Sequence, residues 1–316
     1  MSRVDMALFS GLLVGGLALA LVASDVAVAY TRALAATLGA PAFVVGVVLV
    51  ALGTDLPEIA NSVASHVQGE GDVNVGDSVG STLTQYTLVL GLFPLVIALI
   101  AISRRQVGLV TVLTAAGLVL TTALVADGWL GRVDGIVLVA AWGVAMTVVT
   151  RLLPQAQHDD PPSVRVRGHL PQAAVVLVAL LAVGAGATAA VRGLVSLSEE
   201  LGVPEFLLAF FGASLGTSAP EIAVDLTALR RGVPAIALGD ALGSSLIDST
   251  LSIGVGPIVA PAAVTARLAV LASLYTLGAI LVVGTLLVVR RRHDRRSGAV
   301  LIGLYALSYA VLVAGE

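Results

Sequence analysis

Two glutamates stand inside sequence that is otherwise apolar enough to cross a lipid bilayer. Glu58 ends the hexapeptide GTDLPE (53–58), and Glu221 ends the hexapeptide GTSAPE (216–221). A carboxylate at membrane depth costs at least about 2.5 kcal/mol on insertion scales, so it is a candidate for function by default. Its presence at two matching motifs predicts a shared role for both acids.

The proline in each motif also exposes backbone oxygens to possible ligands. Proline has no N–H, and the Gly-Thr before it loosens the same turn, so the carbonyls of 51–54 and 214–217 are predicted to be freed. Ser81 and Ser244 follow glycine at matching points further along the chain. Oxygen ligands with two carboxylates, and without His or Cys, describe a site for a hard cation such as Ca²⁺ or Na⁺.

The composition is typical of a protein with many membrane crossings. The chain has 316 residues, of which 58% are hydrophobic and 12% charged, and its mean hydropathy is +1.02. It contains no cysteine and no lysine, which excludes disulfides, thiolate metal sites and a Schiff-base lysine. No basic tract long enough for nucleic acid and no phosphate-binding loop for ATP is present. We expect no cofactor and no enzymatic activity.

Ten stretches satisfy the requirement of about 20 mainly apolar residues per crossing. The first is too long, and lacks the cleavage site, for a signal peptide. The predicted crossings are 6–30, 36–65, 73–102, 107–126, 129–153, 172–195, 204–229, 234–262, 266–290 and 297–314.

The arginines orient these crossings. Ten crossings place both termini on one side of the membrane, where four of the 17 basic residues fall, and the other thirteen fall on the opposite side. Because basic loops stay in the cytoplasm, both termini are predicted to be extracellular, in a multi-pass protein of the plasma membrane surrounded by lipid.

The chain is an internal duplication. Shifted by 163 residues, segment 53–94 aligns with segment 216–257 without a gap, and 16 of 42 positions are identical, including the helix-breaking and polar ones. The expected organisation is a first repeat (1–153), a cytoplasmic linker (154–171) and a second repeat (172–316). Because each repeat holds five crossings, the second must enter from the opposite face. Inverted repeats with interrupted helices place a binding site near the bilayer midplane.

Other polar residues receive structural interpretations. Asp77 and Asp240 follow glycine at predicted helix starts, and we interpret them as N-caps rather than ligands. Ser62 and Asp225 are expected to be solvated or to support the ligands. The histidines lie near loops and are interpreted as surface residues: His66, His158, His169 and His293.

The two motifs, each followed by GD and then GS, resemble the paired alpha-repeats of the sodium/calcium exchanger family within the cation/calcium antiporter superfamily. The resemblance covers both 42-residue repeats and fits the ten-helix prokaryotic members. It implies an all-α membrane fold of two inverted five-helix repeats, with alternating access and sliding of the first and sixth helices. It also implies that Glu58 and Glu221 bind Ca²⁺. The remaining Ca²⁺ and Na⁺ ligands that it implies are Thr54, Thr217, Ser218, Ser81, Ser244 and the carbonyls of Ala51 and Ser214.

Two positions depart from the family's pattern. Asp55 stands where Ser is usual, as at Ser218, and Gln85 stands where the family places Asn or Asp, as at Asp248. The extra charge and changed reach in one repeat leave the coupling ion open. Na⁺/Ca²⁺ antiport is the first interpretation, and H⁺- or K⁺-coupled Ca²⁺ antiport is the second, although the proton-coupled branch usually shows GN-x-x-E. A cation channel is a distant alternative. The protein is expected to act as a monomer.

Overall fold

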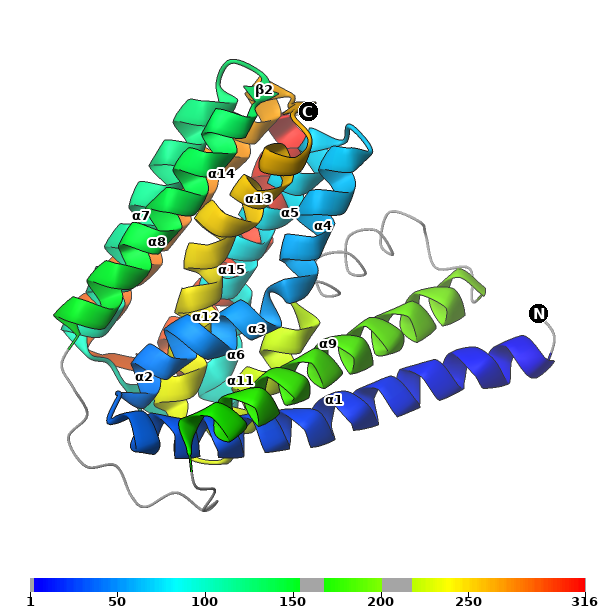
Figure 1. Ribbon diagram of the computed structural model, residues 1–316, viewed down its shortest axis with the longest axis vertical. Helices are drawn as coiled ribbons and strands as arrows, with labels where there is room; N and C mark the ends of the chain where they lie inside the picture. Colours follow the sequence, from blue (N-terminus) through cyan, green and yellow to red (C-terminus); the bar gives the residue numbers. More distant parts are fainter. Residues whose placement is uncertain (1–2, 154–167, 201–217, 316) are drawn as a thin grey trace.

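The computed structural model describes residues 3–153, 168–200 and 218–315, which form a bundle of membrane-spanning helices (Figure 1). The elements of the first repeat are α1 (Arg3–Leu38), α2 (Ala42–Val45), the π-helical turn η1 (Gly46–Val50), α3 (Ala51–Thr54), α4 (Leu56–Val67), α5 (Gly71–Thr84), the π-helical turn η2 (Gln85–Val89), α6 (Leu90–Val96), β1 (Leu99–Ala101), α7 (Arg104–Val125), β2 (Trp129–Leu130) and α8 (Arg132–Leu152).

The second repeat reproduces this order. Its described elements are α9 (His169–Glu200), α11 (Ala219–Arg230), α12 (Pro234–Ile247), the π-helical turn η3 (Asp248–Ser252), α13 (Ile253–Val259), β3 (Ala262–Ala263), α14 (Ala266–Arg290), β4 (Arg292–Asp294) and α15 (Arg295–Gly315). Both ends of α11, α12, η3, α13 and α15 lie 163 residues after those of α4, α5, η2, α6 and α8. The duplication found in the sequence is therefore a duplication of structure.

The described helices account for nine of the ten predicted crossings. Seven helical spans among the described residues are long and apolar enough to cross a membrane, and the bent pair formed by 42–54 and 56–67 makes an eighth. Helix α15, with 21 residues, occupies the predicted tenth crossing. Helix α11 is the described end of the predicted crossing 204–229, most of which lies outside the described residues, as does most of the predicted linker.

Two short antiparallel ladders join the repeats. Strand β1 pairs with β4, and strand β2 pairs with β3. The repeat relates one ladder to the other, because the positions of β1 and β4 correspond to those of β3 and β2. These connections satisfy backbone groups between helices, where the chain would otherwise leave them unpaired.

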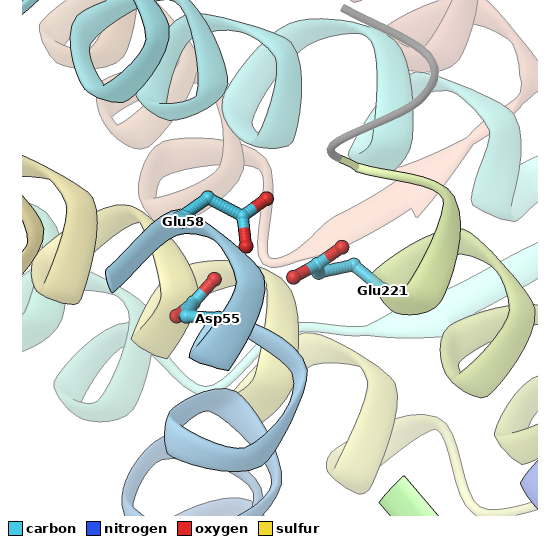
Figure 2. Close-up of side chains that lie close together, drawn as sticks. All are labelled: Asp55, Glu58 and Glu221. Carbon is cyan, nitrogen blue, oxygen red and sulfur yellow. The ribbon is translucent and has the colours of Figure 1, made fainter. Parts of the chain in front are cut away.

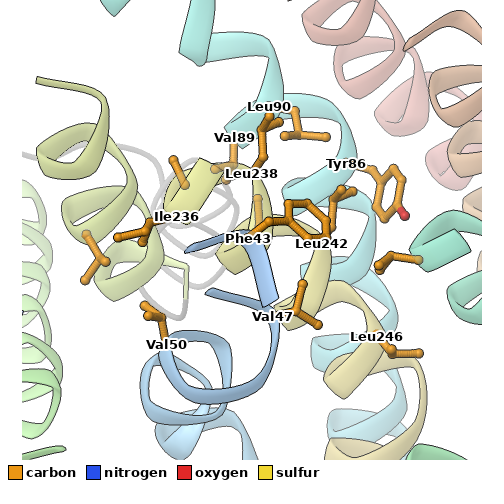
Figure 3. Close-up of a cluster of buried hydrophobic side chains, with 14 of the residues drawn as sticks. Phe43, Val47, Val50, Tyr86, Val89, Leu90, Ile236, Leu238, Leu242 and Leu246 are labelled. Atoms are coloured by element: carbon orange, nitrogen blue, oxygen red, sulfur yellow. The ribbon is translucent and has the colours of Figure 1, made fainter. Parts of the chain in front are cut away.

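The interior is built where α12 lies against α2 and η1. A Cβ atom added at Gly239 would lie 2.3 Å from the Phe43 carbonyl oxygen, so this approach requires glycine. Figure 3 shows the surrounding apolar cluster, in which Phe43 and Val47 lie among Tyr86 and Leu242. Helices α5 and α12, which carry the GD and GS dipeptides of the two repeats, contribute to this buried cluster and can line a site there.

Two prolines inside helices leave carbonyls that side chains from the opposite repeat satisfy. Pro94 has no N–H for the carbonyl of Leu90, which instead accepts a 2.6 Å hydrogen bond from His293 Nε2. Pro257 likewise leaves the carbonyl of Ile253, which accepts a 3.1 Å bond from Asn74 Nδ2. Helices in lipid need every backbone group paired, so these bonds hold the two repeats together.

The prediction that His66 and His293 are surface residues is therefore wrong. Both are buried, at 1% and 0% exposure. His66 Nδ1 lies 2.8 Å from the carbonyl oxygen of Ala260, and His293 pairs with Leu90 as described. Burial lowers the pKa of His293, which keeps the ring neutral, with Nε2 as the donor.

Replacing Asn74 by alanine should destabilise the protein by about 1–3 kcal/mol, because the Ile253 carbonyl would be buried without a donor. The measurement is the unfolding temperature in detergent. The matched control is the double variant Asn74→Ala/Pro257→Ala, in which residue 257 regains a backbone N–H for that carbonyl. If the double variant is no more stable than Asn74→Ala alone, the carbonyl is not the reason for the loss.

Candidate cation-binding site

Three buried carboxylates, contributed by both repeats, meet in the middle of the bundle. Each of Asp55, Glu58 and Glu221 offers one oxygen, and these oxygens all lie within 4.8 Å of one another. None of the three side chains is more than 2% exposed. Figure 2 shows Glu58 and Glu221 turned toward each other, with Asp55 beside them. Acids from both hexapeptide motifs therefore lie together, as expected for two glutamates with a shared role.

The helix break positions these acids. Asp55 stands between α3 and α4, where the helical segment 42–54 and helix α4 are bent by 44° relative to each other. Pro57 lies in the first turn of α4, where its missing N–H is tolerated, but it deprives the Gly53 carbonyl of its usual donor. Glu58 and Glu221 are in the first turns of α4 and α11, where the positive ends of the helix dipoles favour carboxylates.

The prediction that the Ala51 carbonyl is freed is wrong. Its oxygen accepts a 3.0 Å bond from the Asp55 N–H and lies 3.1 Å from Thr54 Oγ1, so it is already in use. The proline acts four residues before itself, at Gly53, because an α-helical N–H pairs with the carbonyl four residues earlier. Any binding of a cation by Ala51 must use the second lone pair of its oxygen.

Most of the other predicted ligands are buried, as the three acids are. Asp248 on η3 is a charged neighbour of Asp55 and Glu58. Gln85 occupies the matching position on η2 and is also buried. Both residues begin π-helical turns, which occur frequently at functional sites. Ser81, Ser218 and Ser244 are likewise buried, whereas Ser214 and Thr217 lie outside the described residues.

Many oxygens of this cluster are buried without a hydrogen-bond donor. Within the described part of the chain, they are both carboxylate oxygens of Asp55, Glu221 and Asp248, Glu58 Oε2, Gln85 Oε1, and the hydroxyls of Ser218 and Ser244. Buried polar atoms are normally paired, so a group of orphaned oxygens indicates a missing positive partner. Anionic and neutral oxygens at close range can bind a dehydrated hard cation.

The prediction that Asp77 and Asp240 are N-caps is wrong. Asp240 and Asp77 are not N-caps, because α12 begins at Pro234 and α5 at Gly71, six residues earlier in each case. Asp225 is 0% exposed, so of its two predicted roles the solvated one is wrong, and the supporting one stays a prediction. The proline at 234, an N-terminal signal, could have placed the start of α12 correctly.

Comparison with known proteins gives concordant matches. A family model described as sodium/calcium exchanger protein matches residues 8–151 and 172–314. CaxA from Alkalimonas amylolytica is 30% identical over 262 residues, which cover 79% of this chain and 81% of CaxA. The inner membrane protein YrbG from Escherichia coli (strain K12) is 27% identical over 271 residues, covering 82% of each chain.

A solved structure matches over almost the whole length. The sodium-calcium exchanger NCX_Mj soaked with 10 mM Na⁺ and zero Ca²⁺ superposes with a TM-score of 0.81 at 22% identity, covering 96% of this chain and 99% of NCX_Mj. At this identity the likeness establishes the fold. The chain has the exchanger fold, an all-α membrane architecture, as predicted, and the ten predicted crossings in two repeats are consistent with that fold.

Proposed function

The chain belongs to the sodium/calcium exchanger protein family of cation/calcium antiporters, and we propose that it exchanges Ca²⁺ for Na⁺ across the membrane by alternating access. The observation that carries the proposal is the buried group of Asp55, Glu58 and Glu221, whose oxygens lie within 4.8 Å of one another. Their oxygens would replace the hydration shell of one Ca²⁺ or of several Na⁺ ions, and their negative charges would balance the charge of those ions. A site that binds either Ca²⁺ or Na⁺, but not both at once, couples the transport of the two ions.

We assign the ligands according to charge and position. Glu58 and Glu221 are the principal Ca²⁺ ligands, and Asp55 and Asp248 supply further charge. The neutral ligands of the Ca²⁺ and Na⁺ sites would be Thr54, Thr217, Ser218, Ser81, Ser244, Gln85 and the carbonyls of Ala51 and Ser214.

The helices that would move are α1 and α9, which lie side by side across one side of the bundle in Figure 1. A Cβ atom at Gly186 would lie 2.8 Å from the Gly16 carbonyl oxygen, so the two backbones are in direct contact and would slide as one unit. A cavity of about 290 Å³ lies between α9 and the break at Pro57. It would give this unit room to move past the site, so that each face of the membrane gains access in turn.

Proton coupling is the second candidate, and Asp55 is the observation that favours it. An additional buried carboxylate offers an oxygen at which H⁺ competes with a metal cation. The two functions, and coupling to K⁺, make different predictions for which gradient drives Ca²⁺ movement.

The test is ⁴⁵Ca²⁺ uptake by the purified protein in proteoliposomes. We expect an outward Na⁺ gradient to drive uptake, and an imposed pH or K⁺ gradient of equal size to drive little. Uptake driven only by the pH gradient would replace Na⁺ by H⁺ in the proposal. Ca²⁺ flux that dissipates its own gradient without any counter-ion would indicate a channel.

We further propose that the two repeats (1–153 and 172–316) are joined by a cytoplasmic linker (154–171), and that the protein acts as a monomer in the plasma membrane. In this cysteine-free chain, cysteines replacing Arg165 and Arg292 should be labelled only from the cytoplasm, and a cysteine replacing Ser2 only from outside. Labelling of all three from one face would contradict the proposed topology.

A further inference from the structure

Asp225 and Asp240 form a second pair of buried carboxylates beside the three-acid cluster. Asp225 lies on α11 one turn after Glu221, and Asp240 lies on α12 one turn before Ser244. Neither aspartate is exposed at all (0% each). Helices α11 and α12 pack against each other, and the two carboxyl groups are close enough to interact electrostatically. The ligand assignment above does not use this pair.

Thr54 connects the pair to the central cluster. Its Oγ1 lies 3.2 Å from Asp240 Oδ1 and also 3.2 Å from the Val50 carbonyl and 3.1 Å from the Ala51 carbonyl. A hydroxyl has a single proton, so it cannot satisfy all three acceptors. Thr54 therefore leaves most of the charge of Asp240 uncompensated.

The remaining oxygens of the pair lack donors. Both carboxylate oxygens of Asp225, and Oδ2 of Asp240, are buried and without a hydrogen-bond partner among the residues that the structure describes. Two ionised carboxylates about 4 Å apart repel each other by about 4 kcal/mol at an effective dielectric constant of 20. Both groups therefore stay ionised only if a cation lies between them; without a cation they would share a proton.

At the equivalent positions of the first repeat, groups of the protein itself donate the hydrogen bonds. Asp77, the equivalent of Asp240, accepts a 2.7 Å bond from the Asn61 amide. Ser62, the equivalent of Asp225, accepts a 3.0 Å bond from the Gly256 N–H. In the second repeat, Val224 stands at the position of Asn61, and an acid stands at the position of Ser62. The second repeat has therefore lost a donor and gained an acid at one place.

From these observations we infer that Asp225, Asp240 and Thr54 bind one monovalent hard cation, Na⁺, at a site separate from the three-acid cluster. Carboxylate and hydroxyl oxygens suit hard cations. Ca²⁺ requires six to eight oxygen ligands, more than two carboxylates and one hydroxyl provide. A divalent ion here would also repel the Ca²⁺ expected at Glu221. Because Thr54 contacts both Asp240 and the carbonyl of Ala51, a proposed ligand of the first site, occupancy of one site should affect the other.

This inference rests on the proposed function only for the presence of Ca²⁺ in the neighbouring cluster, so the test measures binding rather than transport. The full-length protein in nanodiscs is saturated with ²²Na⁺ at one fixed pH above neutrality, and the number of ions per protein is counted. Asp225→Ser gives position 225 the residue of its equivalent, Ser62, and Asp225→Asn preserves its shape. Asp77→Asn is the matched control, because it removes the equivalent acid that the protein already partners.

Both Asp225 variants should bind one Na⁺ fewer than the natural protein and the Asp77→Asn control, while ⁴⁵Ca²⁺ binding persists and shows that the fold is intact. An unchanged Na⁺ count in both variants would overturn the inference. If the variants in that case also bind one proton fewer, the two aspartates share a proton instead of a metal ion. If the natural protein fails to bind Ca²⁺ but the Na⁺ count still falls by one, the proposed function fails and this site stands.

Discussion

Glu58→Gln and Glu221→Gln should each abolish Ca²⁺ exchange while the protein still inserts and folds. An amide has nearly the shape of the carboxylate but lacks the charge that balances a dehydrated divalent ion. Leaving a buried charge without its partner costs about 3–5 kcal/mol. This corresponds to a loss of Ca²⁺ affinity of about a hundredfold to several thousandfold.

The unfolding temperature distinguishes a loss of Ca²⁺ binding in these variants from misfolding. Without bound cation, each variant removes one of several mutually repelling buried carboxylates, so its unfolding temperature should not fall. With Ca²⁺ added, the natural protein should gain stability because the ion binds only the folded state, and the variants should gain little. The measurements are ⁴⁵Ca²⁺ flux and unfolding temperature with and without Ca²⁺. The control is Glu70→Gln, because Glu70 is exposed; near-normal exchange in either site variant would remove that glutamate from the ligands.

Asp55→Ser should keep Ca²⁺ transport but change its coupling. The substitution makes the first motif match the second, where Ser218 stands at the equivalent position. Asp55 is buried against Glu58 and Glu221, so its charge must be balanced by a proton or by a further cation during each cycle. Removing it should either shift inhibition by protons to lower pH or reduce the number of co-ions per Ca²⁺.

The pH profile and the reversal potential in proteoliposomes distinguish these two results. The reversal potential reports the charge moved per cycle, with each elementary charge worth about 2.3 kcal/mol per 100 mV. The reciprocal variant Ser218→Asp, which adds an acid to the second motif, should change the same quantities in the opposite direction. If Asp55→Ser leaves both the pH profile and the reversal potential at their natural values, Asp55 takes no part in coupling.

The sequence predicted those features that depend on repetition and on the cost of charge in lipid. An ungapped shift of 163 residues located the paired elements, because an insertion within an interrupted helix would rotate its polar face away from the site. Glu58 and Glu221 were identifiable because an acid at membrane depth needs a partner. Asp55 lies close to both of them, because one oxygen of each of the three acids is within 4.8 Å of the others.

The wrong predictions for Asp240 and His293 have a common physical origin. In soluble proteins glycine and proline usually mark the ends of helices, whereas in membrane helices they also occur within the helix. A glycine before Asp240 is typical of a helix start. Gly239 instead lies within the continuous helix α12, where it permits close backbone contact with Phe43. Consequently Asp240 is central rather than terminal. His293 is buried because Pro94 leaves a carbonyl that needs a donor from far along the chain. Such long-range pairing cannot be read from local sequence.

The most direct test of the central claim is to locate Ca²⁺ in crystals of the protein by anomalous scattering. With saturating Ca²⁺ and no Na⁺, we predict a single strong peak among the carboxylates of Asp55, Glu58 and Glu221, and we predict that high Na⁺ abolishes it. A Ca²⁺ peak elsewhere in the membrane-spanning region, or no peak at saturating Ca²⁺, would contradict the assignment of this cluster as the transport site.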